Sequence, residues 1–231
     1  MEFTHRVATT DDLVMLEAVM DAAIRELQQG FLSPEAIESS RAIMGIDTQL
    51  IKDGTYYVVL AGEAVAGCGG WSRRATLYGG DHTSGRDPEP LDPAFDAARV
   101  RAMYTNPAYA RRGVGRLILS LCQQAAKEEG FTRLELMGTM AGEPLYTKYG
   151  FVPIERLTDD RGGVAVPLVN AAMALRTRWA SALSRACTDR SSRRWMLSLP
   201  WLENPPGIVR ACGSLFSSRL SSLGDMSYWS R

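Results

Sequence analysis

A turn rich in arginine and glycine contains the first residues that could do chemistry. It lies between a segment with strand-like alternation and one with helical spacing, and it consists of Arg111, Arg112, Gly113, Val114, Gly115 and Arg116. Glycine lets a backbone approach a ligand closely, the first amides of a helix are free to donate, and the positive end of the helix dipole lies there. Arginine adds fixed charge and planar hydrogen-bond donors. We therefore predict an anion site, best suited to a pyrophosphate, at residues 110–116.

This turn differs from two well-known phosphate-binding motifs. No GxxxxGK[ST] occurs in the chain, and the pair Gly113 and Gly115 lacks the third glycine of a dinucleotide-binding fingerprint. Judged by itself, the turn is equally compatible with a tight connection that carries solvated arginines.

The flanking residues predict the elements that position this turn. Residues 98–105 alternate as a strand does, which would place Val100, Ala102 and Tyr104 on one face. Pro107 ends the strand because proline has no amide to donate. Apolar residues then recur at helical spacing to about Glu129, where Gly130 stops the helix.

The rest of the first three quarters of the chain alternates between helical and strand patterns. The segment 75–93 holds three glycines and three prolines without periodicity, and it could either line an acceptor pocket or form a mobile surface loop. We expect strands at 3–7, 55–60, 64–73, 132–137, 151–155 and 164–169, and helices at 11–28, 33–44 and 142–149.

Two segments together resemble the GNAT superfamily of N-acetyltransferases. The central family motif, Q/R-x-x-G-x-G/A, is similar to residues 110–115 (ARRGVG), although Ala110 departs from it at the first position. A second motif, roughly (F/L)Y-x-x-x-GF, is similar to residues 145–151 (LYTKYGF). The resemblance covers roughly residues 3–175. It implies an α/β fold with a mixed, mostly antiparallel sheet of six or seven strands, flanked by helices on both faces and splayed where the cofactor inserts.

The resemblance also implies acetyl-CoA as cosubstrate and assigns roles to particular residues. The pantetheine arm would pair with the strand at residues 101–105, with the backbone amides of Met103, Tyr104 and Thr105 orienting the thioester carbonyl. The amides of residues 112–116 would take the pyrophosphate, together with the side chains of Arg111 and Arg116.

Tyr146 matches the family's usual general acid. A phenol with a pKa of about 10 is protonated at neutral pH and can donate to a thiolate leaving group with a pKa of about 8.5. The alternative is an aromatic ring that packs beneath the cofactor with its hydroxyl group bonded locally. Tyr149 is expected to be a packing residue.

No residue stands out as the base that accepts the proton of the amine. Glu135 could reach the cleft or only solvent, and Glu26 and Asp96 are no better placed. His5 and His82 are isolated in the sequence, and family members often use a chain of water molecules. We predict no metal site, since the cysteines and histidines show no ligand spacing.

The last quarter of the chain differs in composition from the rest. The whole protein has 231 residues and a formal net charge of zero, but residues 176–231 carry nine Arg, no Lys and three acidic residues. They also contain four of the five tryptophans and twelve serines. We therefore divide the chain into an acetyltransferase domain at 1–175 and an irregular basic tail at 176–231. This tail is either an interaction segment or one that was never selected to fold.

The sequence leads to one functional hypothesis and several alternatives. We expect acetyl-CoA-dependent acetylation of a primary amine on a small molecule or a protein. A coenzyme A-binding sensor without turnover, another acyl donor and an O-linked acceptor stay open, as does a homodimer. Nucleic acid is not an expected partner, because the net charge is zero and no binding motif is recognisable. The N-terminus lacks the apolar core of a signal peptide and no run is long enough to span a membrane, so we expect a cytoplasmic protein.

Overall fold

The computed structural model describes residues 2–175, and the expected basic tail at 176–231 lies outside the described residues. The strands are β1 (Thr4–Val7), β2 (Tyr56–Ala61), β3 (Ala64–Ser72), β4 (Ala98–Thr105), β5 (Arg133–Thr139), β6 (Val152–Asp159) and β7 (Val166–Ala174). The helices are α1 (Leu13–Leu27), α2 (Pro34–Ser40), α3 (Thr48–Lys52), α4 (Val114–Glu128) and α5 (Glu143–Tyr149), with short 3₁₀ turns at Thr10–Asp12 and Pro107–Tyr109. None of the helices in this range is long and apolar enough to cross a bilayer.

The strands form one seven-stranded sheet in the order β1-β2-β3-β4-β5-β7-β6. All neighbouring strands are antiparallel except β4 and β5, which are parallel because α4 carries the chain back between them. The expected mixed, mostly antiparallel sheet of six or seven strands is confirmed.

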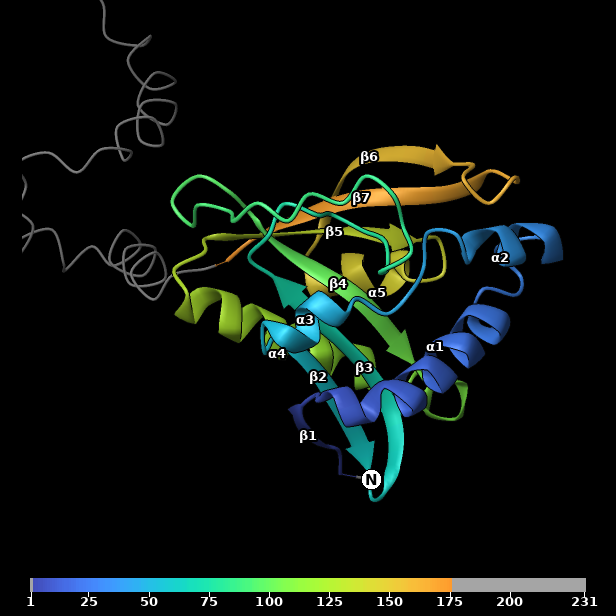
Figure 1. The fold of residues 1–231 in the computed structure, drawn as a ribbon, viewed down its shortest axis with the longest axis horizontal. Coiled ribbons are helices and arrows are strands. Elements are labelled where there is room, and N and C mark those ends of the chain that lie inside the picture. The colour runs from blue at the N-terminus through green and yellow to red at the C-terminus, as the bar shows by residue number, and fades with distance from the viewer. Residues whose placement is uncertain (1, 176–231) are drawn as a thin grey trace, which may run out of the picture. The chain divides into compact units, whose positions relative to one another are not determined.

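Two hydrophobic cores cover the two faces of the sheet. Val58 and Val59 are adjacent in β2 and both fully buried, yet Val58 packs in the core beneath α1 and α3 whereas Val59 packs in the core beneath α4. Successive side chains of a strand point to opposite faces, so a strand covered on both sides is apolar throughout. Figure 1 shows α1 and α3 over one face of β2–β4 and α4 behind the other.

Capping residues explain where α2 and α3 begin, and both helices differ from what the sequence predicted. Ser33 accepts a hydrogen bond from the amide of Ala36, and Pro34 opens α2, but α2 ends at Ser40 rather than near residue 44. The short helix α3 was not expected from the sequence. Asp47 caps it by accepting from the amide of Gln49, and five residues are too few to give a periodic apolar stripe.

Strand β4 departs from the simple alternation expected of it. Val100 packs in the core on the α4 side, whereas Ala102 and Tyr104 pack in the core on the α1 side. The expectation that these three side chains share one face is therefore wrong. The physical reason is an extra residue in β4. Every side chain that follows it in the strand points to the opposite face of the sheet from the one expected.

The glycines of β3 allow α4 to lie close to the sheet. A Cβ atom on Gly67 would lie 2.6 Å from a methyl carbon of Val114, and a Cβ atom on Gly69 would lie 2.8 Å from Ile118. Both contacts are shorter than real Cβ atoms allow. The missing side chains therefore let the first turn of α4 lie directly against the sheet.

Candidate functional site

The site begins where β4 and β5 separate. The two strands pair over only three positions, from Ala98 opposite Leu134 to Val100 opposite Leu136. Beyond Val100, β4 remains paired with β3 as far as Thr105, while β5 remains paired with β7. Figure 1 shows the two strands diverging from this point. Their facing edges are thus left open to a ligand, as the predicted splay requires.

A β-bulge in β4 lies at the start of this opening. Gly70 pairs with Arg101 and Cys68 pairs with Tyr104, so one residue of β3 is opposite two residues of β4, Ala102 and Met103. Ala102 has a φ of 49°, in the left-handed region that non-glycine residues rarely adopt. The hydroxyl group of Tyr56 donates to its carbonyl oxygen at 2.7 Å and so holds the bulge in place.

The turn before α4 presents several backbone amides without acceptors. Val114, Gly115 and Arg116 are the first residues of α4 and have no helical acceptor. The amides of Arg111 and Gly113 also lack an acceptor among residues 2–175. Left-handed residues at short spacing in such a turn tend to direct amides to a common point, a concavity that suits anions. Here Arg111 has a φ of 63° and Gly113 a φ of 96°.

Arg112 differs from the other residues of this turn. Its amide donates to the carbonyl oxygen of Tyr109 at 3.4 Å, and its guanidinium group lies over the ring of Tyr109. Arg112 is also absent from the lining of the adjoining cleft. Arg112 is thus the one predicted contact outside the cleft lining, and the amide of Arg111 is a further candidate donor to an anion.

A cleft of about 650 Å³ extends from this turn along the open edge of β4. Its walls come from α1, β4, the start of α4, and α5. The structure brings together there nine of the ten residues predicted for the site, namely Met103, Tyr104, Thr105, Arg111, Gly113, Val114, Gly115, Arg116 and Tyr146.

Tyr146 is held in this cleft by close contact with two glycines. A Cβ atom on Gly138 would lie 2.6 Å from the ring, and one on Gly142 would lie 2.7 Å from it. Phe151 packs edge-on against the same ring at 6.2 Å. Sequence reasoning missed both glycines, although a lone glycine inside a strand pattern, as at Gly138, is a known sign of close approach.

The hydroxyl group of Tyr146 is protonated and available to donate. Burial raises the pKa of Tyr146 to about 12 by penalising the charged phenolate. The hydroxyl groups of Tyr104 and Tyr149 donate to protein acceptors, whereas that of Tyr146 has no partner among residues 2–175. The alternative of a locally bonded, purely packing tyrosine therefore suits Tyr149, which is bonded to Gln123 at 2.7 Å, better than Tyr146.

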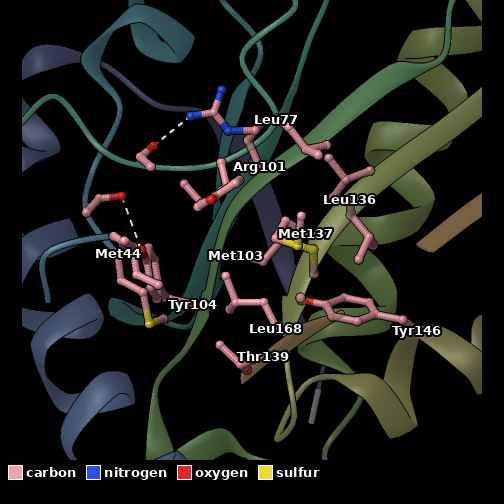
Figure 2. A pocket seen from close by; sticks show the side chains of 17 residues that line it. Met44, Leu77, Arg101, Met103, Tyr104, Leu136, Met137, Thr139, Tyr146 and Leu168 are labelled. Atoms are coloured by element: carbon pink, nitrogen blue, oxygen red, sulfur yellow. Dashed lines mark hydrogen bonds between the residues drawn. The ribbon is translucent and has the colours of Figure 1, made fainter. Parts of the chain in front are cut away.

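A smaller pocket of about 90 Å³ adjoins this cleft at Tyr146. Met103, Tyr104, Thr139, Tyr146 and Met44 line both hollows, so the two meet at the splay between β4 and β5. Figure 2 shows the hydroxyl group of Tyr146 pointing into this pocket, with the guanidinium group of Arg101 at its far end. A nucleophile in the small pocket and an acyl donor in the large cleft would therefore meet beside Tyr146.

A buried ion pair fixes the long loop that closes the small pocket. Arg101 lies 2.9 Å from Asp47, and both side chains are 2% exposed. Arg101 also donates to the carbonyl oxygens of Thr76 and Gly79. Leu77 and its neighbours thereby line the pocket. Of the two interpretations of segment 75–93, the structure favours the one in which it forms part of a pocket wall.

The other titratable candidates lie away from both hollows. Glu135 forms an ion pair with Arg99 and accepts from Asn170, which leaves it no freedom to act as a base. The ring of His82 bonds to a backbone carbonyl oxygen at 2.8 Å. Neither Glu26 nor Asp96 lines either hollow. Within residues 2–175, then, neither hollow is lined by a carboxylate or a histidine.

The chain is similar in sequence to known acetyltransferases. A family model described as an acetyltransferase (GNAT) domain matches residues 52–153, which include the whole splay, the turn and Tyr146. YedL of Escherichia coli K12, an uncharacterized N-acetyltransferase, is 31% identical over 159 residues, which cover 66% of this chain and 85% of that protein.

Solved structures are similar to it in fold. A GCN5-related N-acetyltransferase from Rhodopseudomonas palustris has a TM-score of 0.56 at 16% identity, and the match covers 74% of this chain and 95% of that one. The PaiA N-acetyltransferase from Thermoplasma acidophilum, solved in complex with coenzyme A, has a TM-score of 0.52 at 16% identity, with 75% and 99% covered.

Proposed function

This chain belongs to the GNAT superfamily of N-acetyltransferases, and we propose that residues 1–175 transfer an acetyl group from acetyl-CoA to a primary amine by direct attack. One observation carries the proposal. The cleft at the splay of β4 and β5 continues from the amides at the start of α4 to the hydroxyl group of Tyr146 beside a second pocket, and within residues 2–175 these groups have no hydrogen-bond partner.

The residues of the cleft fit an acyl-CoA thioester. Free amides at Arg111 and at the start of α4, with the guanidinium groups of Arg111 and Arg116, would hold the pyrophosphate. The open edge of β4 offers backbone groups to the amides of a pantetheine arm, in the manner of an added strand. The Thermoplasma acidophilum enzyme, which shares the fold, was solved with coenzyme A bound, and this supports the same class of ligand here.

Acetyl transfer would depend mainly on backbone amides and on one side chain, that of Tyr146. When bound, acetyl-CoA supplies an activated acyl group. Backbone amides near Met103 would donate to the thioester oxygen as negative charge develops there, an interaction worth about 3 kcal/mol in comparable sites. As the nitrogen–carbon bond forms and the carbon–sulfur bond breaks, Tyr146 would give its proton to the departing sulfur. The amine would lose its own proton to water, and Tyr146 would regain one from solvent.

The proposal is tested by two measurements on the full chain. Titration calorimetry with acetyl-CoA measures binding, and release of free thiol in the presence of a panel of amines measures transfer. Binding together with amine-dependent thiol release is the expected result. Binding without release from any amine would instead support a sensor, and release driven by alcohols would support an O-linked acceptor.

A further inference from the structure

The small pocket restricts the kind of amine that can reach Tyr146. We propose that the acceptor is a weakly basic primary amine next to a small side chain, such as the α-amino group of an amino acid amide or a peptide that begins with alanine or valine. This inference rests on the proposed acetyltransferase function. It comes from the volume, the lining and the charge of the pocket.

The volume sets a limit on the group beside the amine. The pocket measures about 90 Å³, whereas an engineered apolar cavity of about 150 Å³ accommodates benzene. Methyl and isopropyl groups are smaller than a benzene ring, but indole is larger. Apolar side chains make up about half of the lining residues, among them Leu77, Leu136 and Leu168. The wall also exposes at least as much polar as apolar surface, so the volume of the pocket, and not its polarity, limits the group that can enter.

The charges around the pocket oppose a cation. Its titratable lining groups are Tyr78, Arg101, Tyr104 and Tyr146, and among them only Arg101 is charged. The carboxylate of Asp47, which neutralises Arg101 at 2.9 Å, is not part of the lining and also pairs with Arg86. An ammonium ion that entered would lose water without gaining a carboxylate partner, so the acceptor must enter in its neutral form.

The pKa of the amine then determines what fraction of it is neutral, and so able to react, at a given pH. With a pKa of about 10.4, as in lysine, roughly one molecule in a thousand is neutral at about pH 7.4. With a pKa of about 7.7 to 8.0, as in an α-amino group, roughly a quarter is neutral. A pocket that neither binds the ammonium form nor removes its proton therefore favours the α-amine by about two orders of magnitude in the fraction ready to react. The lower nucleophilicity of the weaker base offsets part of this advantage.

The test compares two acceptors of equal shape and different basicity on the full chain. L-alaninamide is matched with its aliphatic isostere, in which an isopropyl group replaces the carboxamide. Thiol release from acetyl-CoA is measured for both between about pH 7 and pH 10. We expect kcat/KM at about pH 7.4 to be about tenfold or more higher for the amide, because its larger neutral fraction outweighs its lower nucleophilicity. It should level off above about pH 8, while that of the isostere should rise about tenfold per pH unit.

Two further arms test the size and the charge of the pocket. L-tryptophanamide should be a poorer acceptor than L-alaninamide by at least tenfold. Thr139→Asp places a carboxylate where the two hollows meet, and it should narrow the ratio between amide and isostere about tenfold, whereas the matched Thr139→Asn should not.

The possible results distinguish a failure of this inference from a failure of the proposed acetyltransferase function on which it rests. Equal kcat/KM for the two amines near pH 7.4, or an isostere rate that does not depend on pH, would overturn the inference and leave the transferase function standing. If acetyl-CoA binds but neither the amide, nor the isostere, nor a broader amine panel releases thiol, the transferase function itself fails.

Discussion

Gly138 and Tyr146 are in such close contact that any side chain on Gly138 would displace the tyrosine ring. A Cβ atom on this glycine would lie 2.6 Å from Cε2 of the ring and 3.0 Å from Cδ2. Gly138 lies in β5 and Tyr146 in α5, so the contact positions the hydroxyl group relative to the splay. Gly138, which has no side chain, therefore sets the orientation of Tyr146, the proposed general acid.

We predict that Gly138→Ala lowers kcat by tenfold or more while the affinity for acetyl-CoA changes little. The added methyl group must push the ring out of line with the departing sulfur, and small misplacements of a reacting group have large effects on rate. Steady-state kinetics and calorimetry on the same preparation measure both quantities. If the effect acts through the ring, the double variant Gly138→Ala/Tyr146→Phe should be no slower than Tyr146→Phe alone. An additive loss would place the effect elsewhere.

Tyr146→Phe should lower kcat by about a hundredfold to ten-thousandfold, because a general acid typically contributes this much. The matched control is Tyr149→Phe, since the hydroxyl group of Tyr149 is bonded to Gln123 instead. Burial raises the pKa of Tyr146 to about 12, so the phenol keeps its proton and should cause no loss of kcat as the pH rises from 7 to about 10. A pH-rate profile is the direct measurement. Unchanged turnover in Tyr146→Phe would reject the assignment.

Arg111→Gln and Arg116→Gln should each weaken acetyl-CoA binding by about tenfold, and the loss should shrink at high salt because exposed charges are screened. Both side chains belong to residues that line the cleft. Arg112→Gln is the control, since Arg112 does not line the cleft. Calorimetry at low and high ionic strength tests the set. A loss in Arg112→Gln equal to the other two would show that overall charge, and not position, holds the phosphates.

Arg101→Met should lower the free energy of unfolding by about 3 to 5 kcal/mol, because it leaves the buried carboxylate of Asp47 with one partner fewer. The loop at residues 73–97 should also lose hydrogen-exchange protection, since Arg101 donates to two of its carbonyl oxygens. Arg25→Met removes a solvent-exposed pair and should cost less than about 1 kcal/mol. Urea unfolding of the two variants compares them directly, and similar losses would contradict the structural role given to Arg101.

The stability of the chain should fall in acid partly through Asp12. Two hydrogen bonds from Arg6 hold the pKa of Asp12 at about 2, below its ordinary value of 3.8. A carboxylate with a lowered pKa stabilises the fold above its unfolded pKa, and that contribution disappears as the pH falls from about 4 to about 2. We expect it to be about 1 kcal/mol, because Arg6 is partly exposed to solvent.

Urea unfolding as a function of pH tests this prediction. Asp12→Asn should flatten the acid limb, whereas Glu63→Gln, which removes an exposed carboxylate in the β2–β3 turn, should not. An acid limb of unchanged slope in Asp12→Asn would show that other carboxylates account for it.

Most secondary structure was predictable because it depends on neighbouring residues. The strand before the turn, the glycine-led start of α4 and the short helix containing Tyr146 all follow from spacing, proline and glycine within about twenty residues. The bulge was not predictable in this way. Nothing in the residues around Ala102 indicates a left-handed conformation. It is imposed by the pairing of the two strands, because one residue of β3, between Cys68 and Gly70, lies opposite two residues of β4.

By itself, the sequence determined the order of the helices and strands, the turn that presents free amides, and the position of Tyr146 in the chain after that turn. Only the tertiary structure decided that β4 and β5 separate after Val100, that Arg112 faces Tyr109, and that Gly138 aims Tyr146. It also joined Arg101 to Asp47 across the fold and so made one wall of the small pocket. The reason is physical: periodicity and capping act over one or two turns of chain, whereas strand register and side-chain contact depend on residues far apart in sequence.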